Sequence, residues 1–435
     1  MSMWRSLSLP IRNKCIFAQC AKRIRTFSSI SMPASSPESS IHDDQEDDAI
    51  AFPENHVGKF GPEDLDVNWE EAASVWDRVA CAPELPDFVV GDGVYGVTNL
   101  QQIQDIGEKG EFQSNSSIYT RHRTFALRIG YTGGAYEFGY QRQKFSDGQI
   151  EPRTVELDVY AAIRATSMGS RSARLTPAGR TDKFVSAVGQ VINFVHSKPV
   201  TPEEFMQELK VTEPVVSGRL AFHDCARVPR QFNARSCATW RRYLYLVPLR
   251  ARSAQISDKA SITAADNHVI DVSVVDAIFR NLEGLTLPYN SFAVGEDRKT
   301  GEGMLDLCTL YRSRAYVVNP DGPSGSPFMC VELVGSRFLR RMVRLLVATA
   351  VREAVKLPSD ERDVDCLRKI CLSNDRKRRA MPFPGSGLCF AGVGFDTRQL
   401  SFYKMQRKVE AQALRDKYAL EDEALAAVAA IPPRA

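Results

Sequence analysis

The sequence predicts an α+β protein with two sheet-based domains and helices packed on the sheets. Segments in which every second residue is apolar, typical of half-buried strands, recur in both halves of the chain, and so do segments with apolar residues on one helical face. A third observation is composition, because 43% apolar and 25% charged residues are close to the averages of soluble globular proteins. At roughly 100–200 residues per domain, 435 residues suggest about two domains plus accessory segments.

The first domain, expected over residues 121–229, begins with a strand. Apolar side chains alternate with others in Thr124–Tyr131, and a following Thr-Gly-Gly ends the strand. Thr154–Thr166 is predicted to be a helix and Gln190–His196 a second strand. Thr-Pro-Glu-Glu at 201–204 begins another helix, because it supplies an N-cap, a proline suited to the first helical position and early acids.

The second domain, expected over residues 230–397, mixes the same two patterns. Strands are predicted at Cys237–Pro248, Phe328–Val334 and Leu388–Phe395, and helices at Val272–Leu282, Ser336–Lys356 and Asp360–Leu372. Residues 398–435 form a C-terminal tail of helical composition.

The first 31 residues carry six basic groups and no acidic one, and they are rich in Arg and Ser. This composition predicts an organellar transit peptide, which would direct the protein to a mitochondrion or plastid. The alternative is a basic tail on a protein of the cytoplasm or nucleus. Residues 32–120 are predicted to be a largely disordered acidic and loop extension, with one short amphipathic helix at Asp66–Ala80.

Charge is segregated along the chain, although the formal net charge is only +3. Residues 32–92 carry 16 acids against two basic groups, whereas residues 93–435 carry 48 basic against 37 acidic groups, a net +11. A basic body is the footprint expected of a protein with a polyanionic partner. An ordinary surface rich in Lys and Arg is the alternative interpretation.

Two classes of protein are disfavoured by the sequence. Apolar stretches such as Leu345–Val351 fall well short of the roughly 20 residues of a membrane-spanning helix, so no membrane partner is expected. The ten Cys include no CxxC pair, which argues against a structural metal site.

The segment Ala-Gly-Arg-Thr-Asp-Lys at 178–183 is the first candidate for chemistry. Arg180 and Lys183 would favour the carboxylate form of Asp182, the form that a nucleophile or general base needs. From these residues alone, a surface turn with three charged side chains is the commoner explanation.

The longer pattern around Asp182 is more specific. Ala-Gly-Arg-Thr-Asp-Lys-x-Val-x-Ala-x-Gly-Gln-Val runs from Ala178 to Val191 and resembles the signature of the TruA family of tRNA pseudouridine synthases. Further segments match the family in its order: Tyr131–Gln143, Phe232–Arg235 with Trp240–Tyr245, Phe338–Arg344, and Gly387–Leu388 with Val393–Phe395. Ser186 stands at a position that is often His in the family but commonly Ser in a eukaryotic branch acting in the anticodon stem-loop.

The resemblance implies a pseudouridine synthase-like fold with a catalytic cleft between the two domains, and an isomerase that uses no cofactor and no metal. Asp182 then attacks the target uridine of tRNA, and the uracil is detached from C1′, turned over and rejoined through C5. Tyr243 stacks on the extruded base and its hydroxyl serves the proton removal at C5, Arg344 is the basic partner of Asp182, and Arg180 holds the target nucleotide out of the helix. Whether the carboxylate adds at C6 of the base or acts at the ribose stays open.

The predicted tRNA contacts follow from the same segments. Alternation in the strand Cys237–Pro248 places Arg241, Tyr243 and Tyr245 on one face, and a helix over Ser336–Lys356 places Arg337, Arg341 and Arg344 on another. Half-buried strand aromatics and a solvated helix face are the alternatives. The predicted substrate-binding residues are Arg180, Lys183, Arg235, Arg241, Tyr245 and Arg341. The basic run at 376–379 suits phosphate contact or a solvated loop equally well.

Departures from the family pattern leave other functions open. Phe184 stands where the family usually has Gly, which predicts a stiffer backbone after Asp182 or a more closed pocket. The alternative function is therefore a catalytically inactive RNA-binding or RNA-folding protein on the same fold. Hydrolysis by two carboxylates is disfavoured, because no motif acid pairs with Asp182. The family forms homodimers, and its eukaryotic members also act alone, so both states stay open.

Overall fold

The computed structural model describes residues 60–100, 103, 123–142, 151–167, 169, 174–196, 200–230, 232–249, 270–294, 307–356 and 359–395, all within the unit Phe52–Ala435. The transit peptide predicted at residues 1–31 and the tail predicted at residues 398–435 lie outside the described residues.

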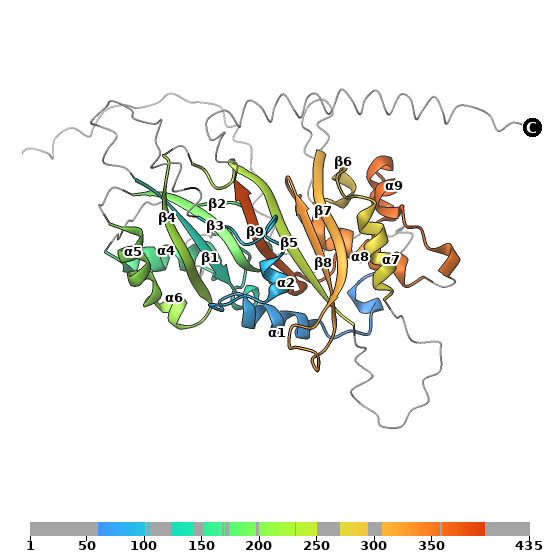
Figure 1. Ribbon diagram of the computed structural model, residues 1–435, viewed down its shortest axis with the longest axis horizontal. Coiled ribbons are helices and arrows are strands. Elements are labelled where there is room, and N and C mark those ends of the chain that lie inside the picture. Colours follow the sequence, from blue (N-terminus) through green and yellow to red (C-terminus); the bar gives the residue numbers. More distant parts are fainter. Residues whose placement is uncertain are drawn as a thin grey trace, which may run out of the picture. The chain divides into compact units, whose positions relative to one another are not determined.

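The described strands form one nine-stranded sheet, shown in Figure 1. Eight of them follow the order β4-β1-β3-β9-β5-β8-β7-β6, and β2 pairs with β3. Their bounds are Arg123–Tyr131 (β1), Thr176–Pro177 (β2), Ser186–His196 (β3), Leu220–Val228 (β4), Ala238–Pro248 (β5), Thr286–Pro288 (β6), Leu307–Val318 (β7), Phe328–Gly335 (β8) and Leu388–Phe395 (β9).

The two predicted sheets are joined at the pairing of β3 with β9. This pairing is parallel and covers two positions, Ser186 with Cys389 and Ala187 with Phe390, whereas the other recorded pairings are antiparallel. The strands expected for residues 121–229 and 230–397 therefore share one mixed sheet, a difference from the prediction of two sheet-based domains. The α+β class itself is confirmed.

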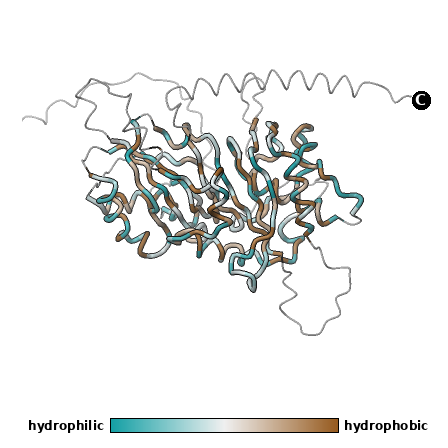
Figure 2. Tube along the Cα trace, in the orientation of Figure 1, coloured by the Kyte–Doolittle hydropathy of each residue, from teal (hydrophilic) through white to brown (hydrophobic). Residues whose placement is uncertain are grey.

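Both faces of the sheet are covered, as the almost complete burial of β3 and β8 requires. In β5, Tyr243 and Tyr245 belong to one hydrophobic cluster and Leu244 and Leu246 to the other, which confirms the predicted alternation. Figure 2 shows hydrophobic segments running through the inner part of the sheet. The larger cluster is completed by α4 (Val155–Ala165), α5 (Pro202–Lys210), α7 (Val272–Arg280), α8 (Met342–Ala354) and α9 (Cys366–Ser373).

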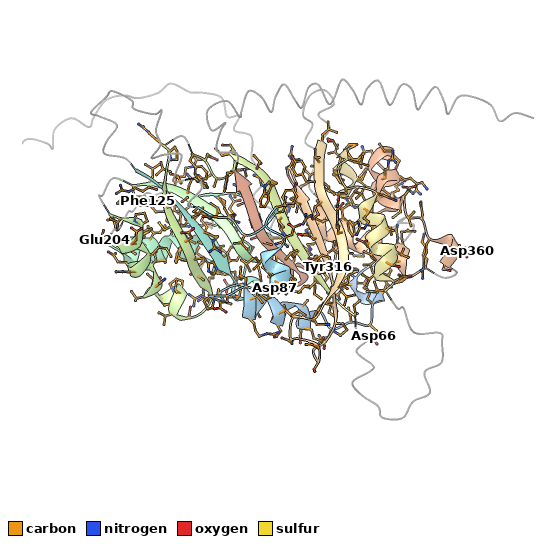
Figure 3. All side chains as sticks on the ribbon, viewed as in Figure 1. Asp66, Asp87, Phe125, Glu204, Tyr316 and Asp360 are labelled. Carbon is orange, nitrogen blue, oxygen red and sulfur yellow. The ribbon has the colours of Figure 1, made fainter. Side chains whose placement is uncertain are left out.

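The helix α5 illustrates how the sequence fixes an element. Thr201 and Glu204 form a capping box, with the Glu204 amide donating to the Thr201 hydroxyl at 3.1 Å and the Thr201 amide donating to Glu204 Oε2 at 3.0 Å. Its buried Phe205 packs against Phe125 and Phe194, with ring centroids 6.1 and 6.0 Å apart. Figure 3 labels Phe125 on the sheet and Glu204 at the start of this helix.

Part of the extension predicted to be largely disordered is folded. The predicted amphipathic helix is α1 (Trp69–Val79), which contacts β3 and β5. Its residues Ala72, Val75 and Trp76 are buried, and the Trp76 indole donates to the Gly387 carbonyl at 3.0 Å. Four apolar positions on one helical face supply enough burial to order this segment, although its composition is acidic.

A buried ion pair attaches the segment after α1 to the sheet. Arg242 on β5 has a side chain that is 1% exposed, and its Nε lies 2.5 Å from Oε1 of Glu332 on β8. Arg242 also donates to the backbone carbonyls of Val89 and, at 3.1 Å, Phe88, both in α2 (Asp87–Val90). One guanidinium thus holds together the N-terminal segment and two central strands.

The helix predicted at Ser336–Lys356 begins six residues late, at Met342 in α8. Ser336 still continues the pairing of β8 with β7, because its amide donates to the Thr309 carbonyl at 2.9 Å and its hydroxyl accepts from the Thr309 amide at 3.0 Å. Arg341 has φ +60°, a left-handed conformation that cannot continue into a preceding helical turn. The predicted basic stripe of Arg337, Arg341 and Arg344 on one helix is therefore wrong.

None of the helices in the described ranges has the length and apolarity that a bilayer crossing would demand.

Candidate active site

The loop between β2 and β3 holds the Asp182 motif, and both sides of the loop are tied down. The Gln190 amide group brackets the Gly179 peptide, donating to its carbonyl at 2.6 Å and accepting from its amide at 3.4 Å. The Thr181 hydroxyl lies 2.8 Å from the Tyr131 hydroxyl of β1. The motif residues therefore position the loop as well as supply its charges.

Asp182 begins a tight turn. The Val185 amide donates to the Asp182 carbonyl at 3.2 Å, and the third residue of the turn, Phe184, has φ +65° while Lys183 does not have a positive φ. This pattern matches a type II turn, in which the third position favours glycine. The structure thus explains why glycine suits this place, and Phe184 occupies it with its side chain 45% exposed.

Three glycines from other segments press directly on this turn. A Cβ on Gly139 would lie 2.2 Å from the Thr181 carbonyl oxygen, one on Gly133 would lie 2.3 Å from the Phe184 carbonyl carbon, and one on Gly385 would lie 2.4 Å from the Lys183 carbonyl oxygen. Real Cβ atoms essentially never approach so closely, so each position requires glycine unless the backbone moves. The backbone around Asp182 is therefore closely packed on three sides.

Hydrogen bonds reinforce the same contact. The Ser186 hydroxyl accepts from the Gly133 amide at 2.9 Å, and the Tyr140 amide donates to the Thr181 carbonyl at 3.0 Å. The described part of the segment Tyr131–Gln143, noted only for its motif, thus supports the Asp182 loop.

The structure brings Arg344 to Asp182. Arg344 lies in the first turn of α8, and its Nη1 is 3.7 Å from Asp182 Oδ2. Their side chains are 14% and 29% exposed, so the pair is shielded but reachable from solvent. Arg344 Nε donates to the Phe383 carbonyl at 2.5 Å, which fixes the direction of the guanidinium toward the loop.

Tyr243 lies beside the same loop. Its ring makes edge contacts with Phe338 and Phe390, at centroid distances of 4.9 and 5.1 Å, and its hydroxyl is 3.6 Å from where a Cβ on Gly179 would stand. Burial, and next the nearby Tyr131, raise the pKa of Tyr243 well above its ordinary value. The hydroxyl therefore keeps its proton at neutral pH. Phe338 and Phe390 were missed by the sequence analysis as site residues, although Phe338 begins a matched segment and Phe390 lies between the two matched pieces of the closing strand.

The remaining predicted residues divide into exposed and buried groups. Arg180 and Arg235 are exposed, and the Lys183 ammonium lies 4.8 Å from the centre of the Phe184 ring. Arg341 and Tyr245 are buried, and the Tyr245 hydroxyl donates to the Pro384 carbonyl at 2.7 Å. Tyr245 therefore has a hydrogen-bond partner inside the protein and does not reach the surface where RNA was predicted to bind. Alternation in the sequence identifies which face of a strand a residue lies on, but it does not show whether solvent reaches that face.

Arg241 is also internal. Its Nη2 donates to the carbonyls of Ala178 at 3.0 Å and Arg235 at 2.8 Å, and its Nη1 donates to those of Ser336 at 3.0 Å and Ala238 at 3.2 Å. These bonds tie the start of the Asp182 loop to β5. The predicted RNA contact of Arg241 is thus replaced by a bracing role within the protein.

One member of the basic run at 376–379 turns inward. Arg379 is buried and donates from Nη1 to the carbonyls of Ser291 at 2.6 Å and Ala293 at 2.8 Å. Burial, helped by Arg376, lowers the pKa of Arg379 to about 10. Across the described residues, no cluster of three or more His, Cys, Asp or Glu side chains is arranged to hold a metal ion.

Several known proteins are similar in sequence to this chain. No family model matches the chain. Proteins called tRNA pseudouridine synthase A are similar over nearly their whole length: that of Ligilactobacillus salivarius is 27% identical over 263 residues, covering 59% of this chain and 94% of the relative. That of Brachyspira hyodysenteriae is 28% identical over 259 residues, covering 59% and 95%. That of Latilactobacillus sakei is 29% identical over 256 residues, covering 57% and 93%.

The chain is thus similar to curated members of the TruA family of tRNA pseudouridine synthases. The resemblance predicted from the motifs is thereby confirmed. Among solved structures, a protein from Galdieria sulphuraria titled as unknown covers 54% of this chain and 91% of its own, at 11% identity and a TM-score of 0.16, too low to bear on the fold.

Proposed function

We propose that this protein is a tRNA pseudouridine synthase, an isomerase that converts a uridine of tRNA to pseudouridine with Asp182 as its nucleophile. One observation carries the proposal. Asp182, Tyr243 and Arg344 come from a loop, a strand and a helix far apart in the sequence, yet Arg344 pairs with Asp182 at 3.7 Å and Tyr243 lies against the same loop. These are the residues that match the TruA motifs.

The reaction needs only groups that the site and the substrate supply. The C1′–N1 bond of uridine breaks and a C1′–C5 bond forms, and the proton that leaves C5 is balanced by one taken up at N1. The Asp182 carboxylate attacks the nucleotide, and Arg344, whose Nη1 lies 3.7 Å from Asp182 Oδ2, orients that carboxylate. Attack at C6 of the base and attack at the ribose are both compatible with this position.

The raised pKa of Tyr243 limits its part in the reaction. A phenol that keeps its proton at neutral pH cannot serve as a standing phenolate base, so its hydroxyl takes the C5 proton only while passing its own proton on. Its ring, lined by Phe338 and Phe390, offers an apolar wall on which the extruded uracil stacks.

Binding of tRNA relies on the basic groups around the loop. Unstacking the target base costs a few kcal/mol, and stacking on aromatic rings together with phosphate contacts offsets that cost. In this proposal the phosphate contacts come from Arg180, Lys183 and Arg235, and the tRNA lies in a cleft between residues 121–229 and 230–397. Ser186 favours the eukaryotic branch that acts in the anticodon stem-loop. An organellar location is also part of the proposal.

The direct test uses the full chain and unmodified tRNA transcripts, with no cofactor added. We expect conversion of a specific uridine to pseudouridine, read by mass spectrometry of nuclease fragments after a label that marks pseudouridine. Tight, salt-sensitive binding of tRNA without any conversion would instead establish the inactive RNA-binding alternative.

A second test concerns the packing under the loop. Gly139→Ala forces the Thr181 and Asp182 backbone to move, because the new Cβ would lie 2.2 Å from the Thr181 carbonyl oxygen. A displacement of about 1 Å at a reacting group costs on the order of 10²-fold in rate, so we expect a loss of that size in pseudouridine formation. Gly134→Ala is the matched control, since nothing lies within 4 Å of its Cβ position. Equal rates for the two variants would contradict the assigned role of the packing.

A further inference from the structure

Phe184 is the residue beside Asp182 that the proposed reaction does not use. It has φ +65°, and a bulky side chain in this left-handed region is a backbone outlier. Phe184 as a residue is 45% exposed, among the most exposed large aromatic residues in the described part of the chain. A strained backbone and an exposed ring would both be relieved by glycine, so the presence of Phe184 points to a use for the ring.

The packing of the loop prevents Phe184 from escaping this conformation. The Phe184 backbone is in direct contact with Gly133, and the Lys183 carbonyl lies against Gly385. The hydrogen bond from the Val185 amide to the Asp182 carbonyl, at 3.2 Å, closes the turn. The ring is thus held in a fixed place, two residues from the carboxylate, and little conformational entropy is lost when a ligand meets it.

A cation lies over the ring. The Lys183 ammonium lies over the ring at 4.8 Å from its centroid, and Arg180 is exposed on the other side of Asp182 in the sequence. An exposed aromatic ring beside a cation is a combination that suits single-stranded nucleic acid, with a base on the ring and a phosphate at the cation. The side chain of Asp182 is itself 29% exposed, so the ring does not seal the carboxylate away.

We propose that Phe184 is a stacking platform for a nucleobase of the bound RNA, at the outer edge of the site and next to the uridine that Asp182 attacks. This inference rests on the proposed function and deepens it. The buried ring of Tyr243 lines the inner wall, so the exposed ring of Phe184 meets a neighbouring base that stays in the RNA strand. Phe184 is thereby a substrate-positioning residue that replaces stacking lost when the target base leaves the helix.

Phe184→Gly is the informative variant, because glycine fits the left-handed turn and removes only the ring. We expect tRNA affinity to fall about 5- to 100-fold, the range for loss of one base stack on an aromatic side chain. Phe184→Trp retains a ring and is expected to bind within about threefold of the unaltered protein. Tyr311→Leu removes a similarly exposed aromatic (40%) from β7, four strands from β3, and serves as the control.

Salt dependence separates stacking from charge. A ring releases no counterions, so Phe184→Gly should lower the affinity at every salt concentration without changing the slope of log affinity against log salt. Lys183→Gln should reduce the magnitude of that slope by about 0.7–0.9 if Lys183 meets a phosphate. The Phe184→Trp protein, compared with the unaltered chain, should also show added tryptophan fluorescence that tRNA quenches.

Any of three results would overturn the stacking role of Phe184. The Phe184→Gly protein could bind tRNA with unchanged affinity, or its salt slope could change as that of Lys183→Gln does. In the Phe184→Trp protein, tRNA could leave the added tryptophan fluorescence unquenched. These results are separable from those for the reaction. A protein that forms pseudouridine but binds equally well without the ring refutes the platform alone. A protein that needs the ring for binding yet forms no pseudouridine refutes the proposed reaction and leaves the platform standing.

Discussion

Replacing Asp182 with asparagine is expected to lower pseudouridine formation by on the order of 10⁴-fold or more, the scale seen when a nucleophile is removed. Asparagine has nearly the same shape and leaves the backbone bond from the Val185 amide intact, so the turn is preserved. The charge facing Arg344 is lost, and with it the group that attacks the nucleotide. Affinity for tRNA should stay within a few-fold.

The measurement is single-turnover conversion of a tRNA transcript with enzyme in excess, together with a binding titration at the same ionic strength. Asp321→Asn is the control, because Asp321 is 52% exposed and pairs with Arg78 at the surface, where ion pairs contribute little. An Asp182→Asn protein that converts uridine at the unaltered rate rules out the nucleophile assigned here.

The largest effect on stability is expected from Arg242→Ala. The change leaves the Glu332 carboxylate buried without its 2.5 Å partner and frees the carbonyls of Phe88 and Val89. Breaking a buried pair by removing one member costs about 3–5 kcal/mol. Arg312 Nη1, 3.7 Å from Glu332, offsets part of this loss, so the lower end of the range is expected.

Urea or guanidinium unfolding of the full chain gives the comparison. The double variant Arg242→Met with Glu332→Leu removes both charges and keeps apolar volume, and it should be less destabilised than Arg242→Ala. A single variant as stable as the unaltered protein would show that the pair does not hold the N-terminal segment to the sheet.

Local signals in the sequence located most elements of the described fold. Thr201 and the residues after it predicted the start of α5, and the apolar face of α1 predicted a helix within an acidic extension. β7 was missed because a register shift between Leu310 and Arg312 breaks the alternation into two short pieces, and because the polar Ser313 is buried while Tyr311 is exposed. β4 was missed because His223, Asp224 and Arg227 interrupt its apolar residues.

The candidate site was predictable only as far as its motif. Asp182, Tyr243 and Arg344 followed from the TruA resemblance, and the structure places them together. The sequence did not predict whether the long basic side chains point outward or inward. Arg241 and Arg379 point inward and donate hydrogen bonds to backbone carbonyls inside the protein. Their internal partners lie far away in the sequence, and a local pattern carries no information about them.

The position of β9 has a consequence for biosynthesis. β9 lies between β3 and β5, so the last of the described strands to leave the ribosome occupies the middle of the sheet. Until it emerges, the facing edges of β3 and β5 expose unpaired peptide groups that invite pairing with other chains. Before residue 388 is synthesised, the nascent polypeptide would contain two separate half-sheets whose facing edge strands are unpaired. These edges would be prone to aggregation, so molecular chaperones would have to protect them until β9 is made.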